Sequence, residues 1–270
     1  MFTKRLWVNC NMIQIYSKQD IDILREGGKL LFDVLHELKE KTVEGVDTKT
    51  LNQYALELCI QHKAEPAFLN YKPHGAPRPF PGALCISINE EVVHGIPNEN
   101  NKVLKNGDVV VLDMGILFKG MYTDSAITVV VGGSDKNQTG AKMIDVANKA
   151  LYAAIDSIKP GVRTGTVGHV IEQMVKAESR FSIPYELGGH GIGKTIHEDP
   201  FMPNFGKKGE GPILREGMVL AIEPILTEKK PQMKVLKDGY TYVTADKGLS
   251  VHVEHTVVVT KDGCEVLTSG

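Results

Sequence analysis

The sequence has few cysteines, little net charge and no long apolar run, and each absence excludes a class of protein. Four cysteines among 270 residues are widely scattered and form no C-x-x-C pair, which argues against a zinc ribbon or a disulfide framework. A net charge of −2 and a pI near 6.5 give no electrostatic case for nucleic acid or an anionic membrane. No apolar run approaches the roughly 20 residues that span a bilayer, and the N-terminus lacks a signal-peptide core. We therefore expect a cytoplasmic protein with no nucleic-acid or membrane partner.

The bulk composition is that of an ordinary globular protein. Apolar residues make up 42% of the chain and charged residues 24%. A chain of 270 residues can form one large domain or two modest ones. No Ser/Gly-rich linker divides it, so we expect a single domain over residues 1–270, with residues 1–14 as a flexible N-terminal extension.

The chain contains two halves that follow the same order of elements. Apolar periodicity predicts helices over 17–41 and 48–62 and again over 138–158 and 164–177, with Ser17 as the first N-cap. The helices of each pair are joined by the same pattern, Gly-Val-x-Thr-x-Thr, which begins at Gly45 and at Gly161. Two such halves are expected to face each other around a pseudo-twofold axis, with a shared site between them.

Each half also carries two acidic residues at the ends of apolar runs. In both halves a Gly precedes the first acid by six positions, and a second acid opens another apolar run. The four acids are Asp113, Asp124, Glu223 and Glu254. Burying four bare carboxylates on strands costs several kcal/mol or more each, so a cation is expected among them. A bound metal meets that need best.

The first two acids are predicted to lie on the two strands of one hairpin. Residues 107–115 and 121–131 have strand patterns, and the turn falls near residues 118–120. If the turn centres between Phe118 and Lys119, Asp113 and Asp124 are directly opposite each other. If it centres on Lys119 and Gly120, they are diagonal. In either register the two carboxylates share a face, where like charges repel unless a cation joins them.

Histidines supply the remaining ligand type. His190 lies between glycines that let the backbone crowd a site. His197 follows His190 by seven positions and precedes Glu-Asp-Pro, and His94 lies in Val-His-Gly-Ile-Pro. His252 shares the face of Glu254, although a cross-strand role is expected for it. Four carboxylates and one imidazole suit a neutral site with two divalent ions, as in aminopeptidases, phosphatases and nucleases. Such ligands favour Mn, Fe, Co or Zn, without fixing which.

Four motifs together resemble one known family. They are SINEEVVHGIP at 87–97, GHGIG at 189–193 with HEDP at 197–200, IEP at 222–224 and VEHT at 253–256. The chain resembles a type I methionine aminopeptidase, in its minimal bacterial form, from about Ile15 to Leu267. This resemblance implies an α+β pita-bread fold of the creatinase/aminopeptidase kind. In that fold a curved antiparallel sheet is backed by two pairs of helices, and two halves are related by a pseudo-twofold axis.

The resemblance also implies a role for each ligand. Asp113 would bind one metal, Asp124 and Glu254 would bridge both, and His190 and Glu223 would bind the other. Glu223 would also act as the general base on the bridging water. His94 would hydrogen-bond the scissile peptide nitrogen, and His197 would stabilise the tetrahedral intermediate. Hydrolysis needs these three functions from different groups.

The family's methionine pocket is lined by aromatic residues and a cysteine. The corresponding residues here are Tyr71, Phe80, Cys85, Ile196 and Tyr240. Ile196 stands where an aromatic residue is usual, and Tyr240 where tryptophan is usual. The Pro-rich stretch over 72–82 is longer than the family pattern and is either a pocket rim or a plain surface loop. A less aromatic pocket is therefore expected to discriminate less tightly between methionine and norleucine-like side chains, whereas the reaction is expected to be unaffected.

The implied function is removal of the initiator methionine from nascent proteins with a small second residue. Expected partners are the N-termini of these chains and, transiently, the ribosome, and the protein is expected to be a monomer. One alternative is an X-Pro aminopeptidase or prolidase, although residues 1–16 are too few for the extra domain usual there. Another is a non-catalytic pita-bread module. Glu223 follows His197 by only 26 positions (223 − 197), which leaves no room for the helical insertion of type II enzymes.

Overall fold

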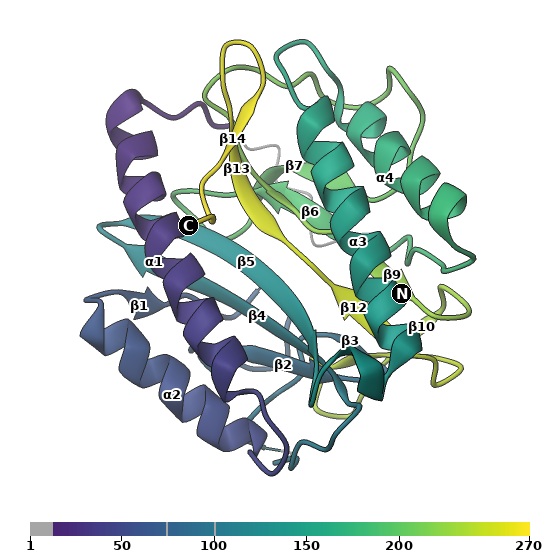
Figure 1. The fold of residues 1–270 in the computed structure, drawn as a ribbon. Helices are drawn as coiled ribbons and strands as arrows, with labels where there is room; N and C mark the ends of the chain where they lie inside the picture. Colours follow the sequence, from purple (N-terminus) through teal and green to yellow (C-terminus); the bar gives the residue numbers. More distant parts are fainter. Residues whose placement is uncertain (1–12, 74, 100) are drawn as a thin grey trace.

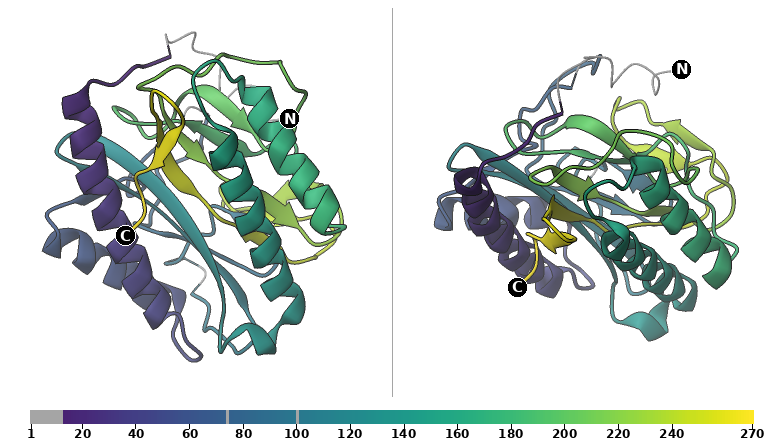
Figure 2. Two further views of the ribbon diagram at one scale, coloured as in Figure 1. Left: turned by 45° about the horizontal axis from the view of Figure 1, so that its top comes forward. Right: turned by 90° about the horizontal axis from the view of Figure 1, so that it is seen from above.

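The computed structural model describes residues 13–73, 75–99 and 101–270. The predicted N-terminal extension therefore lies outside the described residues except for its last two. Four long helices cover one side of a curved sheet (Figures 1 and 2). Their bounds agree with the predicted ones to within a residue: α1 (Lys18–Lys41), α2 (Thr48–Gln61), α3 (Gln138–Ser157) and α4 (Thr164–Glu178).

Short-range hydrogen bonds explain where the first helix begins, and a glycine explains how closely it packs. The Ser17 side chain accepts from the backbone N–H of Asp20, and the Asp20 carboxylate accepts from Ser17 in return, which forms a capping box. In the middle of α1, a Cβ added at Gly28 would sit 2.2 Å from the carbonyl oxygen of Leu267. The C-terminal segment can therefore lie directly against the helix because position 28 is glycine.

The strands form antiparallel ladders in two groups and two smaller pairings. In the first half β4 (Val109–Phe118) pairs with β5 (Met121–Val130), with β2 (Cys85–Ile88) and with β1 (Glu65–Pro66). The strands of the second half run in the order β14 (Cys264–Val266), β13 (His255–Val259), β8 (Val219–Ile222), β6 (Gly188–Gly191) and β7 (Glu198–Pro203). The smaller pairings join β10 (Met233–Val235), β11 (Tyr242–Thr244) and β3 (Glu91–Val93), and β12 (Ser250–His252) with β9 (Ile225–Thr227).

The backbone repeats between the halves as the sequence pattern predicts. Gly45 and Gly161, which begin the matched connectors, have φ of +87° and +88°, a conformation that favours glycine. Each connector also makes an isolated antiparallel bridge to its own half, Asp47 with Val103 and Arg163 with Ile213. The predicted α+β architecture with two related halves is therefore confirmed.

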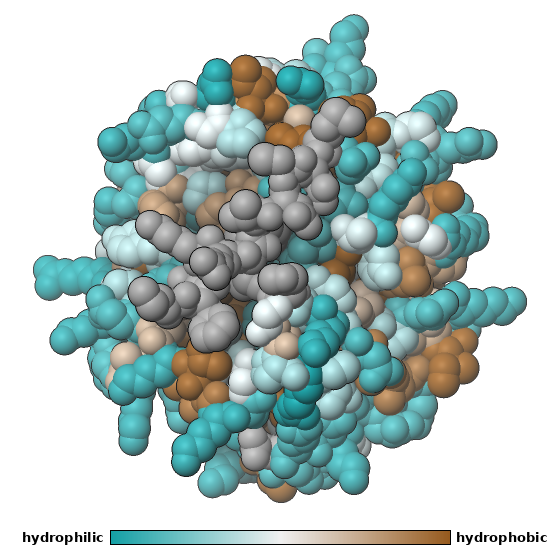
Figure 3. Space-filling view, turned by 180° about the vertical axis from the view of Figure 1, so that it is seen from behind, coloured by the Kyte–Doolittle hydropathy of each residue, from teal (hydrophilic) through white to brown (hydrophobic). Residues whose placement is uncertain are grey.

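Apolar side chains fill the space between the helices and the sheet in each half. One cluster joins α1 and α2 to β4, and another joins α3 and α4 to the strands of the second half. Seen from the side opposite the helices, the surface is mostly hydrophilic, with small scattered apolar patches (Figure 3). Among the described residues, no helix is both long enough and apolar enough to cross a bilayer.

Candidate metal centre and substrate pocket

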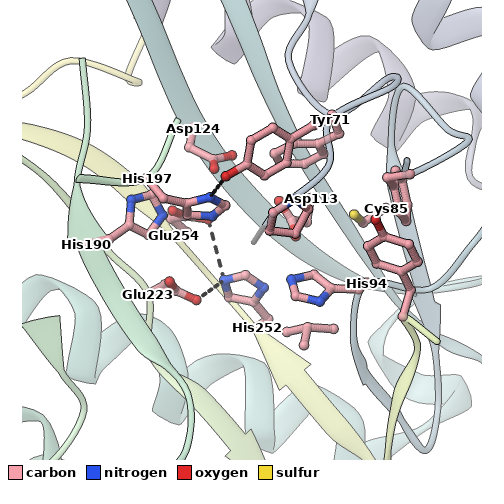
Figure 4. A pocket seen from close by; sticks show the side chains of 15 residues that line it. Tyr71, Cys85, His94, Asp113, Asp124, His190, His197, Glu223, His252 and Glu254 are labelled. Atoms are coloured by element: carbon pink, nitrogen blue, oxygen red, sulfur yellow. Dashed lines mark hydrogen bonds and ion pairs between the residues drawn. The ribbon is translucent and has the colours of Figure 1, made fainter. Parts of the chain in front are cut away.

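A pocket lies where the two halves meet, and it is lined by residues from both (Figure 4). Its lining includes every predicted site residue except Ile196. The lining residues are Phe68, Tyr71, Pro73, Phe80, Cys85, Val93, His94, Asp113, Asp124, His190, His197, Glu223, Tyr240, His252 and Glu254. Phe68, Pro73 and Val93 were not predicted from the sequence. Pro73 belongs to the Pro-rich loop, which is therefore a pocket rim and not a plain surface loop.

The hairpin register places three acids side by side. Asp113 is opposite Ala126, and Gly115 is opposite Asp124, so the turn centres on Lys119 and Gly120 and the two aspartates are diagonal. Ala126 also pairs with Glu254 through an isolated bridge that joins the two halves. Because directly paired residues point to the same face, Asp113 and Glu254 flank the small Ala126 side chain, with Asp124 beside them.

Hydrogen bonds between the halves hold Asp124 and Glu254 in this arrangement. The Thr256 hydroxyl accepts from the backbone N–H of Asp124 at 3.0 Å and donates to the Asp124 carbonyl oxygen at 2.7 Å. The Ser125 hydroxyl donates to the carbonyl oxygen of Glu254 at 2.7 Å. These side chains fix the two backbones, which leaves both carboxylates to face the pocket.

Glu223 and His190 come from the central strands of the second half. Glu223 directly follows β8 and precedes Pro224, where the ladder stops, as the proline predicts. Its carbonyl oxygen accepts from the Asn204 side chain at 2.8 Å. His190 is paired with Ala221 across β6 and β8, so another small residue lies beside the imidazole. His190 Nδ1 lies 2.9 Å from the carbonyl oxygen of Gly191, a contact in which Nδ1–H donates and Nε2 carries the lone pair.

The donor atoms fit a divalent cation. One oxygen of Asp124, one oxygen of Glu254 and one nitrogen of His190 all lie within 4.8 Å of one another, and all three residues are buried. Asp113 and Glu223 line the same pocket outside this tight group. Glu254 Oε1 is buried and has no hydrogen-bond partner among the described residues. A buried carboxylate oxygen without a partner is costly, and a cation would satisfy it.

Burial sets the protonation of these groups when no cation is bound. It raises the pKa of Asp124 to about 7 and that of Glu223 to about 8, and mutual repulsion adds to the effect at Glu223. The pKa values of Asp113 and Glu254 are also well above their usual range, mainly through burial. Burial lowers the pKa of His190 to about 4, so this imidazole is neutral at pH 7 and can bind metal.

Three further histidines surround the acids. His94 has a φ of +58° and an edge contact with Tyr242 at 5.9 Å, and burial lowers its pKa to about 4. His197 Nδ1 lies 2.9 Å from the hydroxyl of Tyr71; although part of the residue is exposed, desolvation of its ring in the pocket, together with the neighbouring imidazoles, lowers the pKa of His197 below 6.5. Both rings are therefore neutral at pH 7. A neutral imidazole can donate one hydrogen bond to a peptide substrate and accept another.

His252 has more than the cross-strand role expected for it. It does pair with Ile225 across β12 and β9, but its ring also lies in the pocket. His252 Nε2 is 3.4 Å from Glu223 Oε2 and 3.5 Å from Glu254 Oε2, and burial lowers its pKa to about 3. The sequence did contain a sign of this position, because strand alternation places His252 on the same face as Glu254.

The apolar end of the pocket combines aromatic residues with Cys85. Phe80 and Tyr240 meet edge to face with centroids 5.2 Å apart, and the Tyr240 hydroxyl donates to the carbonyl oxygen of Arg78 in the rim loop. Cys85 is buried beside them, and burial raises the pKa of its thiol, so it stays neutral. Ile196 is not a lining residue. It is buried behind the wall in the same apolar cluster and packs against Gly115.

Comparison with known proteins identifies the family to which this architecture is similar. Residues 22–261 match the model of metallopeptidase family M24. The chain is 41% identical to a methionine aminopeptidase of Aquifex aeolicus, over 95% of this chain and 98% of that protein. It is 38% identical to methionine aminopeptidase 1 of Bacillus subtilis, over 95% of this chain and 99% of that protein.

Solved structures give the same result for the fold. A crystal structure of a methionine aminopeptidase from Thermotoga maritima superposes with a TM-score of 0.89 at 37% identity, covering 96% of this chain and all of that one. A prolidase from Pyrococcus furiosus has a TM-score of 0.74 at 23% identity and is covered over 66% of its length. This second likeness concerns the fold alone.

Proposed function

This chain belongs to metallopeptidase family M24, and we propose that its pocket removes the N-terminal methionine from nascent polypeptides whose second residue is small. It is a metal-dependent exopeptidase, and its relatives at about 40% identity are methionine aminopeptidases. The observation that carries the proposal is the position of the acids and His190 directly beside an apolar, aromatic-lined cavity. Such a cavity accepts a methionine side chain next to the bond to be cleaved.

We propose that two divalent ions, Mn, Fe, Co or Zn, are held by Asp113, Asp124, His190, Glu223 and Glu254. Asp124 and Glu254, whose carboxylates lie in the tight group with His190, would contribute oxygens to both ions. When bound, such ions polarise a peptide carbonyl and lower the pKa of water. The four carboxylates would balance the charge of two divalent ions, which would offset the burial that raises the pKa of each and the repulsion that adds to it at Asp113, Glu223 and Glu254.

Three residues are proposed to handle protons and developing charge. Glu223, whose carboxylate lies beside His252, is proposed to take the proton of the attacking water as general base. His94 would donate to the scissile peptide nitrogen. His197 would stabilise the tetrahedral intermediate, with its ring oriented by the Tyr71 hydroxyl. The neutral state of both imidazoles at pH 7 allows each to donate without adding a charge that would repel the metals.

The proposed specificity follows from the shape of the wall. Phe68, Tyr71, Phe80, Cys85 and Tyr240 form an apolar surface suited to an unbranched thioether, which adapts to irregular cavities. No observation favours cleavage of X-Pro bonds, since the likeness to prolidases concerns the fold alone. We further propose that the protein is a cytoplasmic monomer that meets its substrates at the ribosome, where nascent N-termini emerge.

The test is hydrolysis of Met-Ala-Ser by chelator-stripped protein, with and without added Mn or Co. We expect release of free methionine only with metal, and no cleavage of an Xaa-Pro dipeptide under the same conditions. An Asp113→Asn variant should bind less metal and release methionine more slowly. If folded wild-type protein released no methionine with any of the four metals, the proposal would be wrong.

A further inference from the structure

The loop between β6 and β7 carries His197, which is proposed to stabilise the tetrahedral intermediate, and Ile196, which packs behind the pocket wall. Its first residues are anchored to the sheet. The backbone N–H of Ile192 donates to the carbonyl oxygen of Val219 at 3.1 Å, and that of Tyr122 donates to the carbonyl oxygen of Gly193 at 2.7 Å. The tip of the loop, at Lys194 and Thr195, is exposed. An exposed tip needs its own restraint if the residues that follow are to keep one position.

A tyrosine from the segment before α1 supplies contacts to this tip. The Tyr16 hydroxyl donates to the Glu198 carboxylate, with its oxygens at 2.7 and 2.8 Å, and accepts from the backbone N–H of Lys194 at 2.9 Å. The same carboxylate accepts from the backbone N–H of Thr195 at 2.8 Å. Hydrogen bonds to an ionised group are about twice as strong as neutral ones. Tyr16 thus joins both sides of the loop although it lies far away in the sequence.

The backbone around Tyr16 is adapted to this contact. Tyr16 N–H donates to the carbonyl oxygen of Gly217 at 2.8 Å, which fixes the residue beside the start of β8. Gly193 has a φ of +152°, and a Cβ added there would lie 2.3 Å from atoms of the Tyr16 ring. The Tyr16 ring is buried, with 6% of the residue exposed, in the apolar cluster that contains Phe80 and Ile196. The ring position is therefore set by the sheet, and the loop is fitted around it.

Movement of the loop tip would change the pocket directly. The Thr195 hydroxyl donates to the carbonyl oxygen of His197 at 3.0 Å, so the tip and the histidine are coupled through the backbone. The side chain of Ile196 contacts Gly115, where an added Cβ would lie 2.9 Å from Ile196 Cδ1. Gly115 is the residue opposite Asp124 in the hairpin. A displaced loop would move Ile196 away from the wall beside the proposed ligands and would move His197 away from the substrate.

We propose that Tyr16 is a positioning residue, which holds the loop over residues 193–198 so that His197 keeps its place in the pocket and Ile196 keeps its place behind the pocket wall. Tyr16 itself touches no substrate. The proposal rests on the proposed function, because the positions of Ile196 and His197 matter to catalysis only if the pocket takes N-terminal methionine.

The test is a Tyr16→Phe variant of the full chain, loaded with Mn and assayed with Met-Ala-Ser. Loss of the hydroxyl should raise KM and lower kcat, with roughly a tenfold loss in kcat/KM, the effect of one strong hydrogen bond. Trypsin should cut after the exposed Lys194 roughly tenfold faster, since the tip opens more often. A merely structural role would reduce the fraction of active enzyme, leaving KM and the rate of cleavage at Lys194 unchanged.

Two further variants sharpen the result. Glu198→Gln should have the same effects, and the double variant should be little worse than either single one, because both changes break one set of contacts. Tyr185→Phe makes the same chemical change at a residue that is 57% exposed, and should behave as wild type. If Tyr16→Phe kept kcat and KM within about twofold of wild type, whatever the trypsin result, the positioning role would be refuted. Failure of the proposed function looks different, since wild-type enzyme would then release no methionine while the trypsin comparison still reported on the loop.

Discussion

Replacing Asp124 by Asn should destroy activity and, in the absence of metal, stabilise the fold. The carboxylate is buried between the halves, and burial raises its pKa from 3.8 to about 7. A shift of about three pKa units corresponds to at most about 4 kcal/mol of unfavourable free energy in the ionised folded state. The substitution keeps the shape of the side chain, and the amide oxygen can still accept from Ser125 N–H as Asp124 Oδ1 does at 3.0 Å.

The sign of the pH dependence follows from the raised pKa. A carboxyl group with a higher pKa in the folded state binds its proton more tightly there than in the unfolded chain. Stability is therefore lost as pH rises from about 4 through about 7, and the loss is complete above the folded-state pKa. Metal-free wild-type protein should accordingly be less stable at pH 8 than at pH 5. The Asn variant should lose the part of this difference that comes from Asp124.

The assay is urea unfolding with a chelator present, at pH 5 and at pH 8. At pH 8 the metal-free variant should exceed wild type by about 2 kcal/mol, about half the upper bound, because water entry and relaxation relieve part of the charge burial. At pH 5 the difference should be clearly smaller but not zero, because pH 5 lies below the folded-state pKa of about 7 yet already above the usual value of 3.8. Asp262→Asn, the same change at an exposed aspartate, should alter stability by less than about 0.5 kcal/mol at either pH. The reasoning would be refuted by a metal-free Asp124→Asn protein less stable than wild type at pH 8, or by an advantage of equal size at both pH values.

Three other substitutions test the site and its support. His94→Ala should lower kcat for Met-Ala-Ser roughly a hundredfold, since it removes a proposed donor, while chemical unfolding should show a small change because the ring lines the pocket. Undiminished kcat would exclude the role. Gly95→Ala should destabilise the fold by about 3 kcal/mol or more in urea, because the new Cβ would lie 2.0 Å from the carbonyl oxygen of Ile86; a stable variant would contradict that packing. Leu267→Ala should lower the free energy of unfolding in urea by about 2–4 kcal/mol, since Leu267 is 2% exposed beneath α1. The kcat per folded molecule should be unchanged.

The local features of this chain could be predicted because they depend on neighbours in the sequence. The capping box at Ser17 needs only residues three positions apart, and the helix bounds follow from apolar spacing within one element. The equivalence of the two halves was visible in the Gly-Val-x-Thr-x-Thr pattern, because a positive φ at Gly45 and at Gly161 requires the same residue type at both places.

Features that join distant segments were harder to predict from the sequence. Both registers of the hairpin satisfied the strand pattern. The structure has the diagonal one, with a two-residue turn in which Lys119 and Gly120 both have positive φ, and the bridge from Ala126 to Glu254 then places the hairpin against the other half. Ile196 was expected to line the pocket but packs behind the wall, because Gly115 on another strand leaves room for it there. The ring of His252 was not expected in the pocket, since the approach of Glu223 to it depends on the end of β8.

The sequence by itself determined the class of fold, the helices and the residue types that can bind metal, because these follow from spacing along the chain and from the chemistry of carboxylates and imidazoles. Only the tertiary structure decided which atoms meet: Asp124 with Glu254 and His190 between the halves, and Tyr16 with Glu198 at the pocket's edge. Such contacts join residues that are far apart in the sequence, from 64 positions (254 − 190) to 182 positions (198 − 16), and their geometry results from how the two halves pack against each other.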